Sequence, residues 1–165
     1  MAKLEYRFLM GEKNNTEDTM VARRQVAALP LRQAKDGALE ILLVTSRDTG
    51  RWIIPKGWTS KRIKDCKAAA REAREEAGVK GKILRDAIGT YRYIKREVGH
   101  GALIEVRVFL LKVSKRCKRW PEKRERRRAW FDLKVAASKV SDPELSTLIG
   151  TLQEGNGGGG TSGQT

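Results

Sequence analysis

Hydrophobic and polar residues alternate over several short stretches of the chain, which predicts a set of β-strands. Ala38–Thr45 is the clearest buried strand and follows an Asp-Gly turn at residues 36 and 37. Ala102–Val113 alternates over its whole length, so it is predicted to be a second long strand. Gln25–Leu31 is also strand-like, but Pro30 lacks an N–H group, which favours an edge position or a bulge there. Shorter or weaker strand signals lie at Trp52–Ile54, Ile83–Ile94 and Ala129–Leu133.

One segment between these strands has helical character. Residues 66–77 are mostly good helix formers, with Asp65 as the predicted N-cap and Gly78 as the predicted C′ residue. Two short helices are predicted after the last strand, with Asp132 and Ser141 as caps. An order of strands, one helix, strands and then helices indicates a mixed α/β fold in a single domain.

The chain has 165 residues, enough for one domain with a substantial core. We place this domain at residues 21–154, after a loose arm over 1–20. Residues 155–165 contain six Gly and no charge, so they are predicted to be a disordered tail. The chain shows no apolar run of roughly 18 residues and no signal-peptide core, so we expect no membrane contact and a cytoplasmic location. Two Cys and one His exclude a disulfide framework and the usual zinc sites.

The formal net charge is +15, and two segments carry most of it. Residues 51–67 hold six basic side chains against one acidic, a net of +5. Residues 111–128 hold ten against two, a net of +8. Such concentrated charge attracts polyanions, whether phosphorylated small molecules or nucleic acid.

Three carboxylates interrupt this positive charge on the predicted helix. Glu75 and Glu76 follow Glu72 by three and four positions, so all three are expected to project from one face. Clustered carboxylates suit a hard cation such as Mg²⁺ or Mn²⁺. Arg71, four residues before Glu75, is placed to hold that carboxylate. An isolated sequence of this kind is usually a solvated helix face, so the flanking residues decide its meaning.

The flanks give this stretch a recognisable pattern. Gly57 lies fourteen residues before Arg71, and Gly78 ends the helix before aliphatic Val79. The segment from Gly57 to Val79 resembles the Nudix box, G-x5-E-x7-R-E-U-x-E-E-x-G-U, with Ala73 at the first aliphatic position. One position departs from the pattern, because Ile63 stands where the box has its first Glu. In the family that Glu mainly supports the box structurally.

The resemblance extends over roughly residues 20–150 and is greatest to the diphosphoinositol polyphosphate phosphohydrolase branch. It implies a Nudix α/β/α sandwich with a mixed sheet. It also implies a Mg²⁺-dependent hydrolase that cleaves phosphoanhydride bonds in a highly phosphorylated small molecule. Diphosphoinositol polyphosphates and diadenosine polyphosphates are the two substrate types that the branch suggests.

By the same resemblance, Glu72 and Glu76 are expected to bind Mg²⁺, with Mn²⁺ as a substitute, together with the backbone at Gly57. The bound metal polarises phosphate oxygens and lowers the pKa of a water molecule. Glu75 is our candidate general base, and Glu72, Glu105 and Glu122 are the alternatives. Positive side chains stabilise the charge that develops during phosphoryl transfer. The predicted phosphate-binding residues are Arg23, Arg24, Ser46, Arg47, Lys56, Lys95, Arg96 and Arg127.

Two other functions are open at this stage. The basic segment 111–128, with Trp120 and Trp130 beside its charges, also suits an RNA 5′-end pyrophosphohydrolase. A non-catalytic nucleic-acid-binding protein on a Nudix scaffold is the other alternative, with Ile63 as the sign of a decayed box. Trp52 and Trp58 are expected to be core or loop-packing residues.

Overall fold

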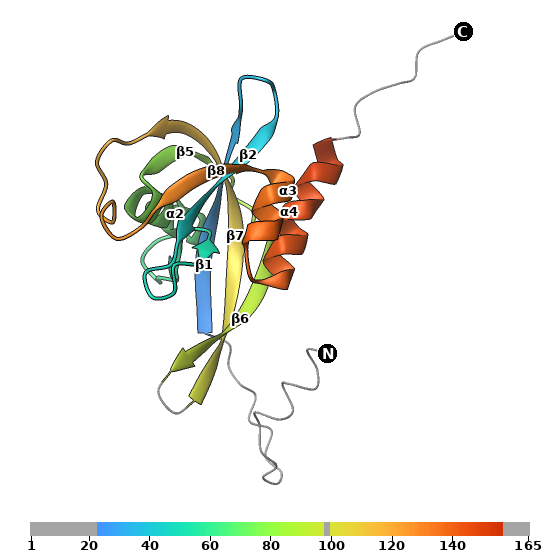
Figure 1. The fold of residues 1–165 in the computed structure, drawn as a ribbon. Helices are drawn as coiled ribbons and strands as arrows, with labels where there is room; N and C mark the ends of the chain where they lie inside the picture. The colour runs from blue at the N-terminus through green and yellow to red at the C-terminus, as the bar shows by residue number, and fades with distance from the viewer. Residues whose placement is uncertain (1–22, 98–99, 157–165) are drawn as a thin grey trace.

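A computed structural model describes residues 23–97 and 100–156 of the chain. At its centre, strand β1 (Arg23–Gln33) pairs in parallel with strand β7 (His100–Arg116), from Arg23 opposite Ile104 to Leu31 opposite Lys112. Strands far apart in the sequence therefore form the middle of the sheet (Figure 1).

The other strands add to this pair in antiparallel fashion. Strand β2 (Leu39–Thr45) pairs with β1, with β3 (Trp52–Ile53) and with β8 (Arg128–Asp132). The short strand β4 (Lys56–Trp58) pairs with the first half of β1. Strands β5 (Val79–Ile83) and β6 (Gly89–Glu97) pair with the two halves of β7. The result is a mixed sheet, as predicted.

Helices cover both faces of this sheet (Figure 1). Helix α2 (Asp65–Glu72) and the π-helical turn η1 (Ala73–Ala77) pack on one face, where small residues such as Ala69 and Ala73 allow close approach. Helix α3 (Leu133–Lys139) packs on the other face through Leu133 and Ala136, and helix α4 (Pro143–Asn156) packs there through Leu145 and Ile149. Alternate residues of the central strands face the two cores. The predicted single-domain α/β/α sandwich is confirmed.

The expected edge position of Pro30 is wrong, because β1 lies in the centre of the sheet. Ala28 donates its N–H to the carbonyl of Pro55, on the side of β1 away from β7. Because alternate residues of a strand direct their N–H groups to the same side, the nitrogen of Pro30 also faces away from β7. On that side, β1 pairs with β4 up to Ala27 and with β2 from Leu31 onward, so Pro30 lies between the two paired stretches. The missing N–H therefore falls in the gap between two partner strands.

Three other boundaries differ from the sequence predictions. Asp65 is the first residue of α2 instead of its cap, and its carboxylate accepts a 2.7 Å hydrogen bond from Arg107. The strand predicted over residues 83–94 divides into β5 and β6. Helix α4 begins at Pro143, so Asp142 precedes it, not Ser141. Asp132 does cap α3, since its side chain accepts from the N–H of Val135.

The predicted arm over residues 1–20 and most of the predicted tail lie outside the described residues. Helix α4 continues to Asn156, two residues into that tail. Among the described helices, none has the length and apolar character needed to cross a membrane.

Candidate active site

The end of helix α2 faces strand β4 at a point where there is no room for a side chain. Gly57 lies against Glu72, and a Cβ atom added at Gly57 would overlap the carboxyl group of Glu72. The glycine therefore lets the β4 backbone approach this carboxylate directly. This contact places the Glu72 carboxylate beside the backbone of β4.

Glu76 lies one turn further on, in η1, and is more deeply buried. Its side chain is 9% exposed, against 37% for Glu75. One oxygen of Glu76 accepts a 3.3 Å hydrogen bond from the N–H of Lys56. Glu72 and Glu76 thus turn toward the same strand, β4, whereas Glu75 is more open to solvent. Single π-helical turns such as η1 occur frequently at functional sites.

Burial controls the electrostatics of these two carboxyl groups. Desolvation raises the pKa of Glu76 to about 7, and the neighbouring Arg126 opposes that rise. Burial also raises the pKa of Glu72, and the negative charge of Glu75 adds to the effect. A bound cation would relieve both effects, because it stabilises the charged form of each group.

A basic side chain from the distant 117–127 loop enters this cluster. Arg126 is 7% exposed and donates to Glu76 at 3.1 Å and to Glu122 at 2.6 Å. It also donates to the carbonyl of Thr45 at 3.0 Å. The N–H of Glu122 in turn donates to the carbonyl of Glu75. The loop therefore brings a fourth carboxylate, Glu122, and a buried cation to the helix.

Further cations gather around two aromatic rings next to Gly57. The guanidinium carbon of Arg23 lies 4.4 Å from the centre of the Trp58 ring, and the ammonium of Lys95 lies 5.6 Å from it. Lys56 places its ammonium 5.4 Å from the Tyr93 ring. Burial lowers the pKa of Lys56, and Glu76 opposes this. Three of the predicted phosphate-binding residues thus lie on or around β4, and Lys56 is the one whose charge acts on Glu76.

Comparison with known proteins assigns this arrangement to a family. The sequence model of the NUDIX domain matches residues 21–149, which is most of the chain and contains the whole site. The chain belongs to the Nudix family. The predicted Nudix box therefore has its expected fold around it, and the chain's resemblance to this family is confirmed.

Several relatives of this Nudix chain are named as hydrolases. It is 33% identical over 117 residues to Nudix hydrolase 21, chloroplastic, of Arabidopsis thaliana, covering 69% of this chain and 58% of that protein. It is 32% identical over 127 residues to diphosphoinositol polyphosphate phosphohydrolase 3-alpha of Mus musculus, covering 75% and 73%. The chain spans less than two thirds of the length of the plant relatives that it matches first.

Solved structures show the same fold at low sequence identity. An Ap4A hydrolase of C. elegans in a binary complex has a TM-score of 0.62 at 20% identity, covering 84% of this chain and all of that one. The NUDIX domain of Shewanella oneidensis NrtR, complexed with ADP ribose, has a TM-score of 0.61 at 17% identity, covering 94% and 99%. Both matches extend over most of the sandwich.

Ile63, the departure from the Nudix box, has a packing role in the structure. It is partly buried against the core between α2 and the sheet. The position that carries a supporting Glu in the box is here held by apolar contacts. Glu72 and Glu76 keep their positions beside Gly57 without that Glu.

The remaining predicted site residues divide into two groups. Arg47 approaches the cluster, because it lies 3.5 Å from Glu122 and 3.9 Å from Glu125. Arg71 lies 3.8 Å from Glu72 instead of holding Glu75, whose nearest basic partner is Arg74 at 3.8 Å.

The other four residues of the predicted set contact their own loops and strands. The Ser46 hydroxyl accepts a hydrogen bond from the N–H of Thr49. The exposed Arg127 lies 5.8 Å from the Trp52 ring. Arg24 contacts Thr59 through its backbone carbonyl, and Arg96 lies opposite Gly101 in the hairpin of β6 and β7. Within the described residues, no hydrogen bond or ion pair joins these four side chains to Glu72 or Glu76.

Sequence reasoning missed Arg126 and Tyr93 as parts of the site. The four-residue spacing of Glu122 and Arg126 was a signal for their mutual ion pair, but it does not point to Glu76, which is 50 positions away. Tyr93 donates to Gln25 at 2.7 Å and so joins β6 to β1 beside Lys56. Neither contact follows from local spacing.

The chemistry of the donors fits a divalent cation, although the side chains as placed do not yet surround one. Within residues 23–97 and 100–156, no three acidic, His or Cys side chains are close enough together to hold a metal jointly. The guanidinium of Arg126 supplies the positive charge at Glu76 instead. The oxygen-only donor set suits Mg²⁺ or Mn²⁺, with Glu72 and Glu76 as the residues that would hold it.

Proposed function

We propose that this chain is a Mg²⁺-dependent Nudix pyrophosphohydrolase that cleaves a phosphoanhydride bond in a highly phosphorylated small molecule, with Mn²⁺ as a substitute metal. One observation carries the proposal. Strand β4 joins two kinds of group, because Gly57 lies against Glu72 and the N–H of Lys56 donates to Glu76, while Lys56 and Trp58 place cations at the rings of Tyr93 and Trp58. A polyphosphate needs both parts, because carboxylates alone would repel it.

The residues of this chain have separate tasks in that reaction. Lys56, Arg23 and Lys95 bind the negatively charged phosphates and orient them. Glu72 and Glu76 would hold the metal, which when bound polarises the phosphate and lowers the pKa of water. Glu75, the most open of the three box carboxylates, takes the proton from the attacking water. The water oxygen forms the new P–O bond as the bridging P–O bond breaks.

The names of the relatives support a small-molecule polyphosphate as substrate. A diphosphoinositol polyphosphate phosphohydrolase is 32% identical, and an Ap4A hydrolase shares the fold. Both names describe substrates with several linked phosphates. Some plant relatives are named as chloroplastic or mitochondrial, so a cytoplasmic location stays a prediction.

The test is a release assay with Mg²⁺ or Mn²⁺ against diphosphoinositol polyphosphates, diadenosine polyphosphates and 5′-triphosphate RNA. Turnover of one of the first two is expected. Glu72→Gln, Glu75→Gln and Glu76→Gln should each lower kcat by at least about 100-fold, since each removes a metal-binding or proton-accepting oxygen. Glu40→Gln is the matched control, because Glu40 pairs with Arg32 outside the site.

Two results would contradict the proposal. Turnover of the RNA alone would favour 5′-end processing as the function. Failure of every substrate with both metals would remove the enzymatic interpretation and favour a binding protein on a Nudix scaffold.

A further inference from the structure

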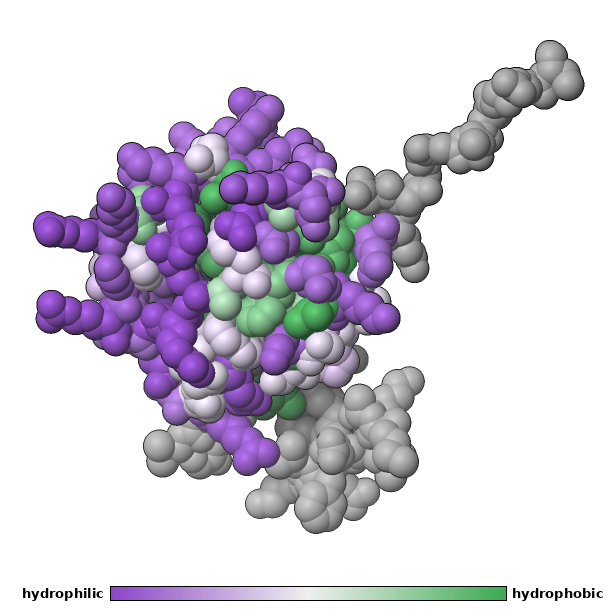
Figure 2. Space-filling model, turned by 45° about the horizontal axis from the view of Figure 1, so that its top comes forward, coloured by the Kyte–Doolittle hydropathy of each residue, from purple (hydrophilic) through white to green (hydrophobic). Residues whose placement is uncertain are grey.

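A second positive surface lies at the edge of the sheet formed by β5, outside the candidate active site. Four exposed lysines from β5 and from the second half of β7 make it up, and we call it the β5 surface: Lys80, Lys82, Lys112 and Lys115. They form two directly opposed pairs, since Lys80 lies across from Lys115 and Lys82 across from Lys112. Hydrophilic side chains cover the side of the molecule on which α2 and β5 lie (Figure 2).

This arrangement does not serve the stability of the sheet. Like charges placed directly opposite each other on neighbouring strands destabilise the pairing. Lysines on an edge strand do prevent edge-to-edge aggregation, which accounts for Lys80 and Lys82. It does not account for Lys112 and Lys115, because β7 is covered by β5 at these positions.

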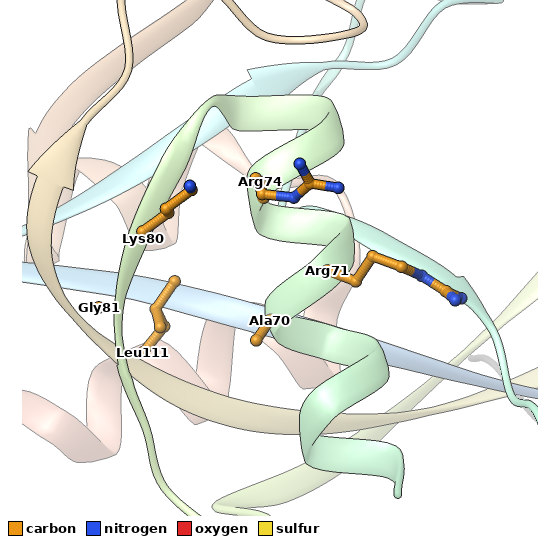
Figure 3. A pocket seen from close by; sticks show the side chains of 6 residues that line it. All are labelled: Ala70, Arg71, Arg74, Lys80, Gly81 and Leu111. Carbon is orange, nitrogen blue, oxygen red and sulfur yellow. The ribbon is translucent and has the colours of Figure 1, made fainter. Parts of the chain in front are cut away.

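A recess between the helix and β5 adjoins these lysines. It has a volume of about 270 Å³ and is lined by Ala70, Arg71, Arg74, Lys80, Gly81 and Leu111 (Figure 3). Gly81 brings β5 close to β7, because a Cβ atom there would collide with the backbone carbonyl of Lys112. In Figure 3 the ammonium of Lys80 points toward the helix, while the side chains of Arg71 and Arg74 point away from Lys80.

The charges of the β5 surface are poorly compensated. Among the described residues, no ion pair involves Lys80, Lys82, Lys112 or Lys115. The neighbouring Arg74 lies 3.8 Å from the carboxylate of Glu75, which is a long distance for an ion pair. The large exposed apolar side chains, Trp58, Ile94 and Val135, belong to β4, β6 and α3. The β5 surface therefore offers charge without the apolar groups that insert into a membrane.

We propose that the β5 surface binds the sugar-phosphate backbone of nucleic acid. Lysine rows that lack aromatic partners contact phosphates and do not stack on bases, so the binding is independent of sequence. It is also independent of the hydrolase reaction, since none of the four lysines contacts Glu72, Glu76 or Gly57. The surface lies on a different part of the sheet from β4, which carries Gly57.

The test uses the whole chain, with EDTA present, and a fluorescein-labelled RNA of about 20 nucleotides with a 5′-hydroxyl end. This probe has no phosphoanhydride bond and cannot be a substrate of the proposed hydrolase. A failure to bind it would therefore count against the β5 surface and not against the proposed hydrolysis. Fluorescence anisotropy at several salt concentrations gives Kd and its salt dependence. The variant is Lys80→Ala/Lys82→Ala/Lys115→Ala. The control, Lys35→Ala/Lys134→Ala/Lys139→Ala, removes the same charge elsewhere.

The β5-surface variant should bind RNA about tenfold more weakly, or worse, at roughly 0.1 M salt. The slope of log Kd against log salt should fall by about 2, because each of the three lost phosphate contacts contributes about 0.7. The control should leave both nearly unchanged. Thermal unfolding should show that the β5-surface variant is as stable as the parent chain or more so, because the Lys80–Lys115 repulsion is gone.

Three outcomes would overturn the proposal. Equal losses in the two variants would show that only the general positive field attracts RNA. Absence of RNA binding at about 50 mM salt would exclude nucleic acid as the ligand of the β5 surface. Binding to vesicles containing about 30% phosphatidylserine, without binding to RNA, would assign the surface to a membrane instead.

Discussion

Arg126 ties together three separate parts of the chain, so its replacement by Met is the most direct test of the site geometry. Arg126→Met keeps an apolar stem but removes the guanidinium, which is buried and bonded to Glu76, Glu122 and the carbonyl of Thr45. Removing one partner of a buried ion pair costs about 3–5 kcal/mol. Glu76 offsets part of this by taking up a proton, because its pKa, already about 7, rises further without the nearby cation.

We therefore expect Arg126→Met to lower the free energy of unfolding by about 2–4 kcal/mol at pH 7. Urea unfolding in EDTA measures this, with the exposed Arg124→Met of the same loop as control. The double variant Arg126→Met/Glu76→Gln should lose less unfolding free energy than the sum of the two single losses. The difference, the coupling energy, should be about 0.5–3 kcal/mol. A loss under about 1 kcal/mol, or strict additivity, would refute the inference that Arg126 is the counter-ion of Glu76.

Two further predictions concern the box carboxylates. Because the folded chain holds the Glu76 proton more tightly than the unfolded chain does, the stabilisation that Glu76 contributes without metal should be complete below about pH 4.5. It should fall by about 3 kcal/mol as pH rises to about 7 and above. Urea unfolding at pH 4 to 8 checks this, and a similar fall in Glu76→Gln would assign it to other groups. Gly57→Ala should change stability by less than about 1 kcal/mol, since the flexible Glu72 side chain can move away from the new methyl group. Its hydrolysis rate should fall by at least about tenfold because that carboxylate is displaced, and unchanged kinetics would contradict this.

The parts of the site that local spacing determines could be predicted from the sequence. Gly57, Glu72 and Glu76 lie where the box pattern places them, because one loop and one helix set their relative positions. Gly78 ends the helix with a positive φ of 63°, as a C′ glycine should. The strands with strong alternation were also found, since burial of one face fixes their pattern.

Contacts between distant segments could not be predicted in this way. Charge counting treats residues 111–128 as one basic segment, but its side chains divide between two roles. Lys112 and Lys115 are exposed on β7, whereas Arg126 is buried, and Arg128 donates to the carbonyls of Ala77 and Gly78 at the end of the box helix. Charge counts along the chain do not distinguish an exposed lysine from an arginine that satisfies buried acceptors.

The three box glutamates show the same limit on a smaller scale. Regular α-helical spacing placed all of them on one face. The π-helical turn η1 changes that geometry, and Glu75 is left more exposed than Glu72 and Glu76. Such a turn depends on the packing around it, so helix propensity gave no sign of it.

The parallel pairing of β1 with β7 also has a consequence for how the protein folds. Paired residues of these strands are 81 positions apart, as with Arg23 and Ile104, and the whole Nudix box lies within the loop that they close. Closing a loop of that length carries a large entropic cost before any contact in the sheet repays it, which favours slow folding. Gly57, which contacts Glu72, belongs to β4, and the sheet partner of β4 is β1. We expect the box helix to form early through local contacts, and the binding site to appear only when the centre of the sheet closes.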